Sequence, residues 1–132
     1  MLITLKDYWM GRDTTYPLDM TPEIEHNAEI LLGLVNLLLT KYGGTHPHVT
    51  SGWRPPRVNA TTPGAAKFSR HMTGQAIDLE DHDGLLDDWL MSDQGLLALQ
   101  EIGLWLEHPA ATKGWTHLQS MPPASKRRVF YP

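Results

Sequence analysis

"SRHMTGQAIDLED", residues 69–81, combines a strand pattern with side chains that bind metal ions. Apolar and polar residues alternate toward its end, which predicts a β-strand over residues 74–80. In such a strand Ile77 and Leu79 share one face and Asp78 points to the other. The apolar face can pack in the core, so Asp78 is expected to point into a cleft.

His71 and Asp78 are both residue types that bind zinc. His71 lies seven residues before Asp78, and Gly74 allows the chain to turn between them. An imidazole and a carboxylate brought together in this way supply two of the three protein ligands of a typical catalytic zinc site. The third ligand is predicted to be His117, in "GWTHLQ". Two histidines and a carboxylate also bind iron in non-haem oxygenases, but the usual one-residue gap between the first histidine and the acid is absent here.

The composition argues against several other classes of protein. The chain of 132 residues fits one domain, residues 1–132, and its net charge of −4 does not favour nucleic-acid binding. It has no cysteine, which excludes disulfides, thiolate metal sites and a cysteine nucleophile. No apolar run approaches the ~20 residues of a membrane span, and charged residues interrupt any signal-peptide core near the N-terminus. We therefore expect a cytoplasmic, monomeric protein that does not insert into membranes.

The remaining patterns predict an α+β fold. Residues 21–43 form the clearest helix, with Thr21 as N-cap and Gly43 as C-cap. Further short helices are predicted at 84–91 and 92–103, and further strands at 48–54, 104–107 and 115–120. Residues 55–69 read as a loop, and the basic residues at 126–128 as a solvated tail. One helix followed by mixed strands and helices is typical of the α+β class.

The strands at 104–107 and 115–120 are expected to form a hairpin. With Glu107 opposite Trp115, Glu107 and His117 would be diagonal neighbours on one face, roughly 7–8 Å apart at the backbone. A glutamate in that position can take a proton from an attacking water without binding the metal. A slip of one residue would place the two side chains on opposite faces.

The stretch "SGWRPPRVNATTPGAAKFSRHMTGQAIDL" resembles the signature of zinc D-alanyl-D-alanine carboxypeptidases and related phage peptidoglycan peptidases. This family includes VanY- and VanX-type dipeptidases and shares its fold with the hedgehog signalling domain. Its pattern is S-G-[YW]-R, an Asn-containing loop, a Gly-Ala pair and S-x-H-x-x-G-x-A-x-D, and the likeness extends to "GWTH" near the end. The resemblance implies a small α+β domain in which an antiparallel sheet, with flanking helices, carries a zinc site.

The resemblance also implies roles for individual residues. The zinc ligands would be His71, Asp78 and His117. Arg54 would hold a carboxylate of the peptide or stabilise the charge that builds on the attacked carbonyl, and Ser69 would hydrogen-bond the substrate backbone. Trp53 and Trp115 are candidate walls of the cleft, although core packing explains each of them equally well.

One position departs from the family pattern. The family usually has a glutamate two or three residues before the last histidine, and this chain has Trp115 and Gly114 there. Glu107 stands ten residues before that histidine and is predicted to be the catalytic base. Asp81 or Glu80 could serve instead, or catalysis could have been lost.

The expected function is that of a zinc metallopeptidase that hydrolyses peptide bonds in the stem peptide of bacterial peptidoglycan. Both D-Ala-D-Ala carboxypeptidase and L-Ala-D-amino acid endopeptidase activity fit these residues. A chain of this kind would act on the cell wall as a phage lysis enzyme (an endolysin) after release, or as part of a virion. The alternative is a non-catalytic binding or virion structural module in which zinc only stabilises the fold.

Overall fold

The computed structural model describes residues 2–132 and contains one mixed sheet within them. Its strands are β1 (Val49–Ser51), β2 (Ala76–Glu80), β3 (Trp105–Glu107), β4 (Trp115–Gln119) and β5 (Val129–Phe130). Their order is β1-β2-β4-β3-β5, with antiparallel neighbours except for β5, which runs parallel to β3. The α+β prediction is confirmed, and the antiparallel sheet is mixed only at its β5 edge.

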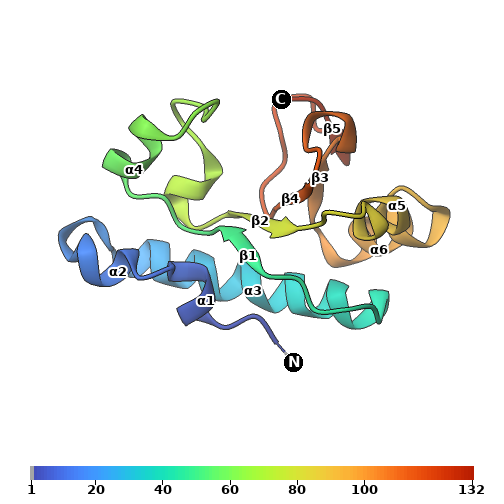
Figure 1. Ribbon diagram of the computed structural model, residues 1–132, viewed down its shortest axis with the longest axis horizontal. Coiled ribbons are helices and arrows are strands. Elements are labelled where there is room, and N and C mark those ends of the chain that lie inside the picture. The colour runs from blue at the N-terminus through green and yellow to red at the C-terminus, as the bar shows by residue number, and fades with distance from the viewer. Residues whose placement is uncertain (1) are drawn as a thin grey trace.

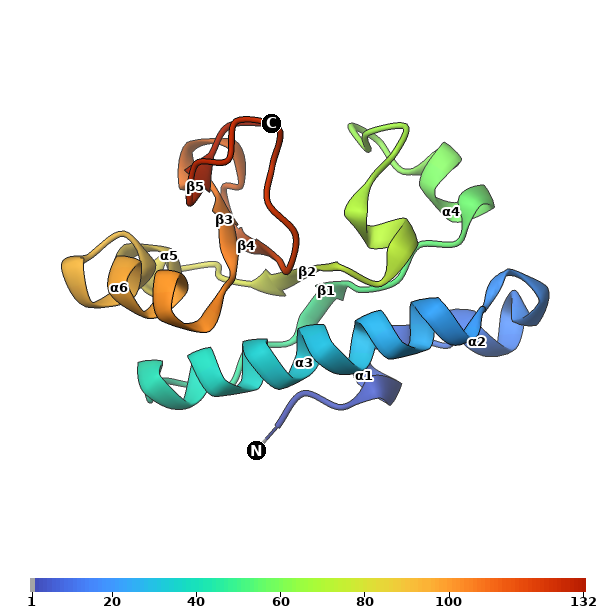
Figure 2. The same ribbon diagram turned by 180° about the vertical axis from the view of Figure 1, so that it is seen from behind.

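The helices lie mainly on one side of this sheet. They are α1 (Leu5–Trp9), α2 (Arg12–Thr15), α3 (Pro22–Tyr42), α4 (Pro56–Thr61), α5 (Leu85–Leu90) and α6 (Asp93–Ile102), with 3-10 turns η1 (Pro17–Asp19), η2 (Arg70–Thr73) and η3 (Pro109–Ala111). In Figure 1, α1 and α3 run along one side, while the α4 region and the C-terminal segment project to the other. Figure 2 shows the same arrangement from behind. None of the helices in the described part of the chain is long and apolar enough to cross a membrane.

Helix α3 begins and ends where its sequence predicts. The Thr21 hydroxyl accepts a hydrogen bond from the Ile24 amide (3.1 Å), and Gly43 ends the helix in the left-handed conformation with φ 71°. Its buried stripe consists of Ala28, Leu31, Leu32, Val35, Leu38 and Leu39. These side chains form the helical half of the core.

The sheet supplies the other half of the core through alternate residues. Ile77 lies opposite Leu118 on the neighbouring strand, and Leu118 lies opposite Leu106. All three belong to the buried cluster that includes the α3 stripe. Because strand side chains alternate between faces, the residues between them point away from the helices. The fold therefore leaves Asp78 and His117 on the opposite face of the sheet.

Two segments differ from their predictions. Residues 55–69 contain the short helix α4, in which Pro56 occupies the first turn that proline tolerates. In the basic segment Lys126 and Arg127 are exposed as predicted, but Arg128 stacks its guanidinium over the Trp105 ring at 4.4 Å and donates to the Leu104 carbonyl, and strand β5 follows it. Both segments border the region where the ligand-type residues meet.

Candidate metal centre

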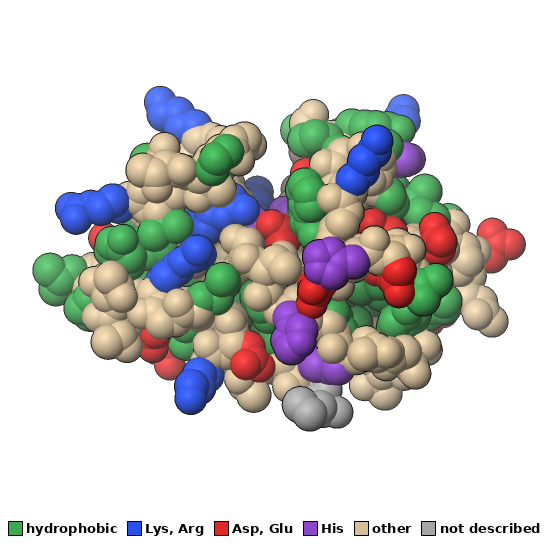
Figure 3. Space-filling model, viewed as in Figure 1, with side chains coloured by type: hydrophobic (Ala, Val, Ile, Leu, Met, Phe, Trp, Pro, Cys, Tyr) green, Lys and Arg blue, Asp and Glu red, His purple; other side chains and the backbone are tan. Residues whose placement is uncertain are grey.

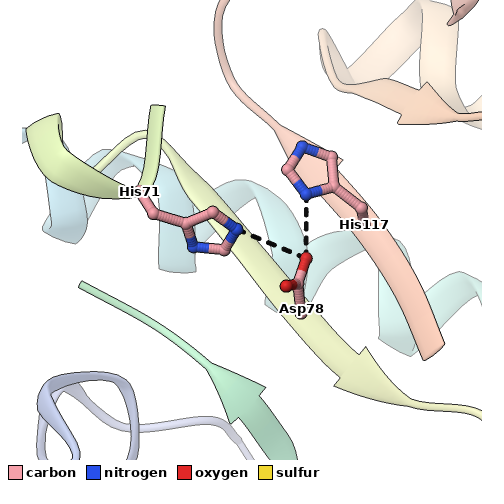
Figure 4. Close-up of side chains that lie close together, drawn as sticks. All are labelled: His71, Asp78 and His117. Atoms are coloured by element: carbon pink, nitrogen blue, oxygen red, sulfur yellow. Dashed lines mark hydrogen bonds and ion pairs between the residues drawn. The ribbon is translucent and has the colours of Figure 1, made fainter. Parts of the chain in front are cut away.

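Two strands and a 3-10 turn bring His71, Asp78 and His117 together (Figure 4). Asp78 on β2 and His117 on β4 are direct partners in the antiparallel ladder. His71 is in η2, whose first turn is capped by the Ser69 hydroxyl accepting from the His71 amide. Gly74 ends this turn with φ 75°, a conformation that favours glycine, and the chain then enters β2.

The ligand atoms of these residues converge on one point. His117 Nδ1 lies 2.8 Å from Asp78 Oδ1, and His71 Nε2 lies 3.4 Å from the same oxygen. One ligand atom from each residue lies within 4.8 Å of the others. His71 and Asp78 are buried and His117 is nearly so, so the cluster is shielded from bulk water.

The hydrogen bonds of the two imidazoles test whether the cluster fits a metal ion. His71 donates from Nδ1 to the Gly52 carbonyl (2.8 Å), which leaves Nε2 without a proton. Among residues 2–132 this buried nitrogen has no hydrogen-bond partner. His117 donates from Nε2 to Gln119 Oε1 (2.9 Å), so in the neutral imidazole Nδ1 carries no proton and faces the Asp78 carboxylate. Two imidazole nitrogens and a carboxylate converge here, one of them a buried nitrogen without a partner, and this donor set fits a metal ion.

The electrostatics of the cluster point the same way. Burial lowers the pKa of His71, which favours its neutral form. Burial opposes ionisation of Asp78, but its close contacts with His117 and His71 outweigh burial and keep the pKa of its carboxyl well below the ordinary value. Burial likewise opposes protonation of His117, but its contacts with Asp78 outweigh burial and raise its pKa. The ionised Asp78 carboxylate therefore attracts positive charge, such as that of a metal ion, to the point between it and His117.

Arg54 lies on the other side of the Asp78 carboxylate. Its Nη2 is 3.4 Å from Asp78 Oδ2, and its Nε donates to the Ser51 hydroxyl at 3.0 Å. The backbone amide of Arg54 donates to the His71 carbonyl, which ties β1 to η2. The guanidinium borders the cleft and is held in place before any substrate binds.

Glu107 is on the same face as the cluster, but in a register that differs from the prediction. Trp105 pairs with Gln119 and Leu106 with Leu118, so the register continues to Glu107 directly opposite His117. The predicted register, with Glu107 opposite Trp115, is wrong by two residues. An even shift keeps both side chains on one face, and Glu107 comes closer to His117 than expected. Burial raises the pKa of the Glu107 carboxyl.

The carboxylates of the other two candidate bases have partners outside the cluster. The Asp81 carboxylate caps α5 by accepting from the amides of Leu86 (3.0 Å) and Asp87 (2.9 Å). Glu80 forms an exposed ion pair with His82. Neither carboxylate borders the cleft, so the alternatives of Asp81 or Glu80 as base are not supported.

The cluster lies at the bottom of a cleft of about 550 Å³. Figure 3 shows the hollow between two projecting parts, with histidine, acidic and basic side chains at its floor. Ser69 and Phe68 line one wall, and Tyr131 and Trp115 belong to the lining as well. Phe68 is 85% exposed and Tyr131 68% exposed, so large aromatic side chains stand free at the rim.

The two tryptophans predicted as cleft walls have different positions. Trp115 is 37% exposed and lines the cleft. Trp53 is 0% exposed: its ring packs edge-on against Trp9 and its indole N–H donates to the Met72 carbonyl. The prediction that Trp53 forms a wall of the cleft and binds substrate is therefore wrong, and the alternative of core packing holds for this residue.

The missed residues of the site are Gln119 and Phe130. Gln119 accepts from His117, and the Phe130 ring packs edge-on against the His117 ring with centroids 6.2 Å apart. Gln119 could have been found from the sequence, because it lies two residues after the predicted ligand His117 on the same strand face. Phe130 had no such signal, because its strand has only two residues.

The fold and the cluster together define a small α+β protein with an open cleft whose floor can hold a metal ion. The Peptidase M15 family model matches residues 12–94, more than half of the chain. The chain belongs to this family of metal-dependent peptidases, which confirms the likeness to D-alanyl-D-alanine carboxypeptidases and VanX-type peptidases. The match includes His71 and Asp78 and ends before Glu107 and His117. No curated protein and no solved structure matches the chain.

Proposed function

We propose that this chain is a zinc-dependent metallopeptidase that hydrolyses peptide bonds in the stem peptides of bacterial peptidoglycan. The observation that carries the proposal is the cluster of His71, Asp78 and His117 on the floor of an open cleft. Membership of the Peptidase M15 family supports a peptide substrate. In this proposal residues 1–132 form one peptidase domain.

The three ligands suit zinc, which binds imidazole and carboxylate and, in catalytic sites, keeps one position open. When bound, zinc would supply a Lewis acid that polarises the peptide carbonyl and activates a water molecule. The chain's own contribution is to orient the ligands: the Gly52 carbonyl fixes the His71 ring and Gln119 contacts the His117 ring.

Glu107 is the proposed general base. It lies opposite His117 in the sheet register and lines the cleft. Its carboxylate would take a proton from the attacking water and pass it to the leaving amine. Partial burial raises its pKa, which makes it a better proton acceptor than an exposed glutamate.

Arg54 and Ser69 are the proposed substrate-binding residues. Arg54 can place its guanidinium against a substrate carboxylate, or against the oxygen of the attacked carbonyl as negative charge develops there. The Ser69 oxygen accepts from the His71 amide, and its hydroxyl hydrogen is available to a substrate carbonyl. Both side chains line the cleft beside His71.

The bond that is cut follows from how the peptide is seated. A D-Ala-D-Ala carboxypeptidase would place the terminal carboxylate on Arg54, whereas an endopeptidase acting between L-Ala and a D-amino acid would extend the chain beyond it. In either case the protein would act on the wall as a phage lysis enzyme after release, or as a virion component.

A second candidate is a binding or virion structural module in which zinc stabilises the fold without catalysis. One observation favours it: Gly114 and Trp115 occupy the positions where the family usually has its glutamate. In that case Glu107 would have no catalytic role.

The test is to measure the metal content of the purified protein and to digest purified peptidoglycan, with the products identified by mass. We expect about one zinc per chain and release of either D-Ala or a defined stem peptide, which also identifies the bond. Zinc without cleavage would favour the structural module. A chain that binds no metal would refute both candidates.

A further inference from the structure

Gln119 makes two hydrogen bonds from its side chain inside the cleft. Its Oε1 accepts from His117 Nε2 (2.9 Å), and its Nε2 donates to the Met121 carbonyl (2.8 Å). The residue is 6% exposed and lies two positions after His117 on β4, so both side chains point to the same face. The amide thus stands behind the imidazole, on the side away from Asp78.

The Met121 carbonyl determines which end of the amide faces the histidine. A carbonyl only accepts, so the Gln119 NH2 group must point to Met121 and the amide oxygen must point to His117. The oxygen in turn requires a proton on His117 Nε2. In the neutral imidazole, the form that binds a metal ion, Nδ1 is then free of a proton and directed at Asp78 Oδ1 (2.8 Å).

The two imidazoles are held by different kinds of partner. The Gly52 main chain orients His71, and a side chain change cannot remove a main-chain carbonyl. His117 depends on a side chain instead. The backbone of Gln119 pairs with Ala76 and Trp105, and any residue could provide that pairing. What glutamine adds at this position is the oriented amide.

We propose that Gln119 is a positioning residue that fixes the His117 ring with Nδ1 toward the metal, so that the metal affinity of this chain depends on its amide oxygen. The inference rests on the proposed metal site, and it makes Gln119 neither a metal ligand nor a catalytic residue. Partners of this kind orient metal-bound histidines and increase their basicity, and their loss typically weakens metal binding 10–100-fold.

The test compares zinc affinity in wild type, Q119L, Q119M and Q119E by competition with a chromophoric chelator. Q119L and Q119M remove the acceptor at similar volume, so we expect about 10–100-fold weaker binding. Q119E retains an oxygen at the same reach, and its affinity should stay closer to wild type than that of either apolar variant. Q100L, on the exposed face of α6, is the matched control and should bind zinc like wild type.

A second readout separates positioning from general packing. In the zinc-loaded protein the His117 Nε2–H should exchange slowly with water in wild type and Q119E, and rapidly in Q119L and Q119M, as measured by imidazole ¹⁵N–¹H spectra. The His71 Nδ1–H should stay protected in all four proteins. If wild type binds zinc and the apolar variants bind it equally tightly, the role of Gln119 is refuted while the metal site stands. Absence of zinc binding in wild type would refute the metal site itself.

Discussion

Substitution of Glu107 by glutamine removes the proposed base without changing the shape of the cleft. Directly opposed residues on antiparallel strands have Cβ atoms about 4.5–5.5 Å apart, so the Glu107 carboxylate can reach a water near the ligands. A positioned general base contributes about 10²–10⁴-fold to rate, equivalent to about 3–5 kcal/mol of transition-state stabilisation. We therefore expect kcat for a stem-peptide substrate to fall by that factor in E107Q.

The same substitution should leave the fold nearly unchanged. Within residues 2–132 the Glu107 side chain makes no hydrogen bond or ion pair, so its loss should alter the free energy of unfolding by only about 0.5 kcal/mol. Zinc content should also stay near one per chain. E29Q, on the exposed surface of α3, is the matched control and should keep full activity.

The assay is amine release from the peptide, monitored by mass, together with thermal unfolding and metal analysis of each variant. A kcat for E107Q above a tenth of the wild-type value would refute Glu107 as the base. Loss of zinc together with activity would refute the separation of Glu107 from the ligands.

Three further predictions concern metal removal, pH and packing. Zinc at a thousandfold excess over its Kd should add about 4 kcal/mol of stability and raise Tm by about 10–15 °C, as measured by calorimetry with and without EDTA; D78N should show no such shift. Burial raises the pKa of Asp87 to about 6 from 3.8. The folded state then binds this proton more tightly than the unfolded state, so the contribution of Asp87 to stability should decrease as pH rises from about 4 to 6. D87N should abolish this slope, which is worth about 1–2 kcal/mol after solvent screening, in urea titrations at several pH values; an equal slope in both proteins would contradict the assignment. G52A would place a Cβ 1.9 Å from the Tyr8 carbonyl oxygen, and should lower the free energy of unfolding by about 3 kcal/mol or more. G33A is the control: nothing lies within 4 Å of its Cβ, so it should be neutral or stabilising. A G52A protein as stable as wild type would refute the close approach of Gly52 to the Tyr8 backbone.

The ligand positions could be predicted from sequence because the local alternation of residues determines which face of a strand each side chain occupies. Alternation in residues 74–80 separates Asp78 from its apolar neighbours whatever strand pairs with it, and β2 has this arrangement. The caps of α3 are equally local, since Thr21 and Gly43 act on the helix ends beside them. Such features need no knowledge of distant parts of the chain.

The hairpin register depended on tertiary structure. Strand β4 pairs with β2 on one side and β3 on the other, and its first residues, Trp115 and Thr116, pair with β2. The connecting segment forms the η3 turn instead of closing the hairpin tightly. Local turn chemistry therefore did not determine which residue lies opposite Glu107.

The C-terminal strand also lacked a local signal. A strand of two residues is too short to show an alternating pattern in the sequence. Strand β5 forms because it pairs with the edge strand β3. There the Leu106 amide donates to the Arg128 carbonyl, and the His108 amide donates to the Phe130 carbonyl. The stacking of Arg128 on Trp105 fastens this edge. A run of basic residues in the sequence looks the same whether or not such an aromatic partner is nearby.

One row of side chains across the sheet carries the proposed chemistry, whereas other segments form the walls that contact the substrate. Ser51 pairs with Asp78, Asp78 with His117, and Glu107 with Phe130, so one level of the sheet receives a residue from every strand. The walls come from elsewhere, chiefly residues 63–69 and 123–132, which the sheet ladder constrains only at β5. Exchange of the 63–69 segment can therefore change which peptide enters the cleft while the residues of this row keep their relative positions.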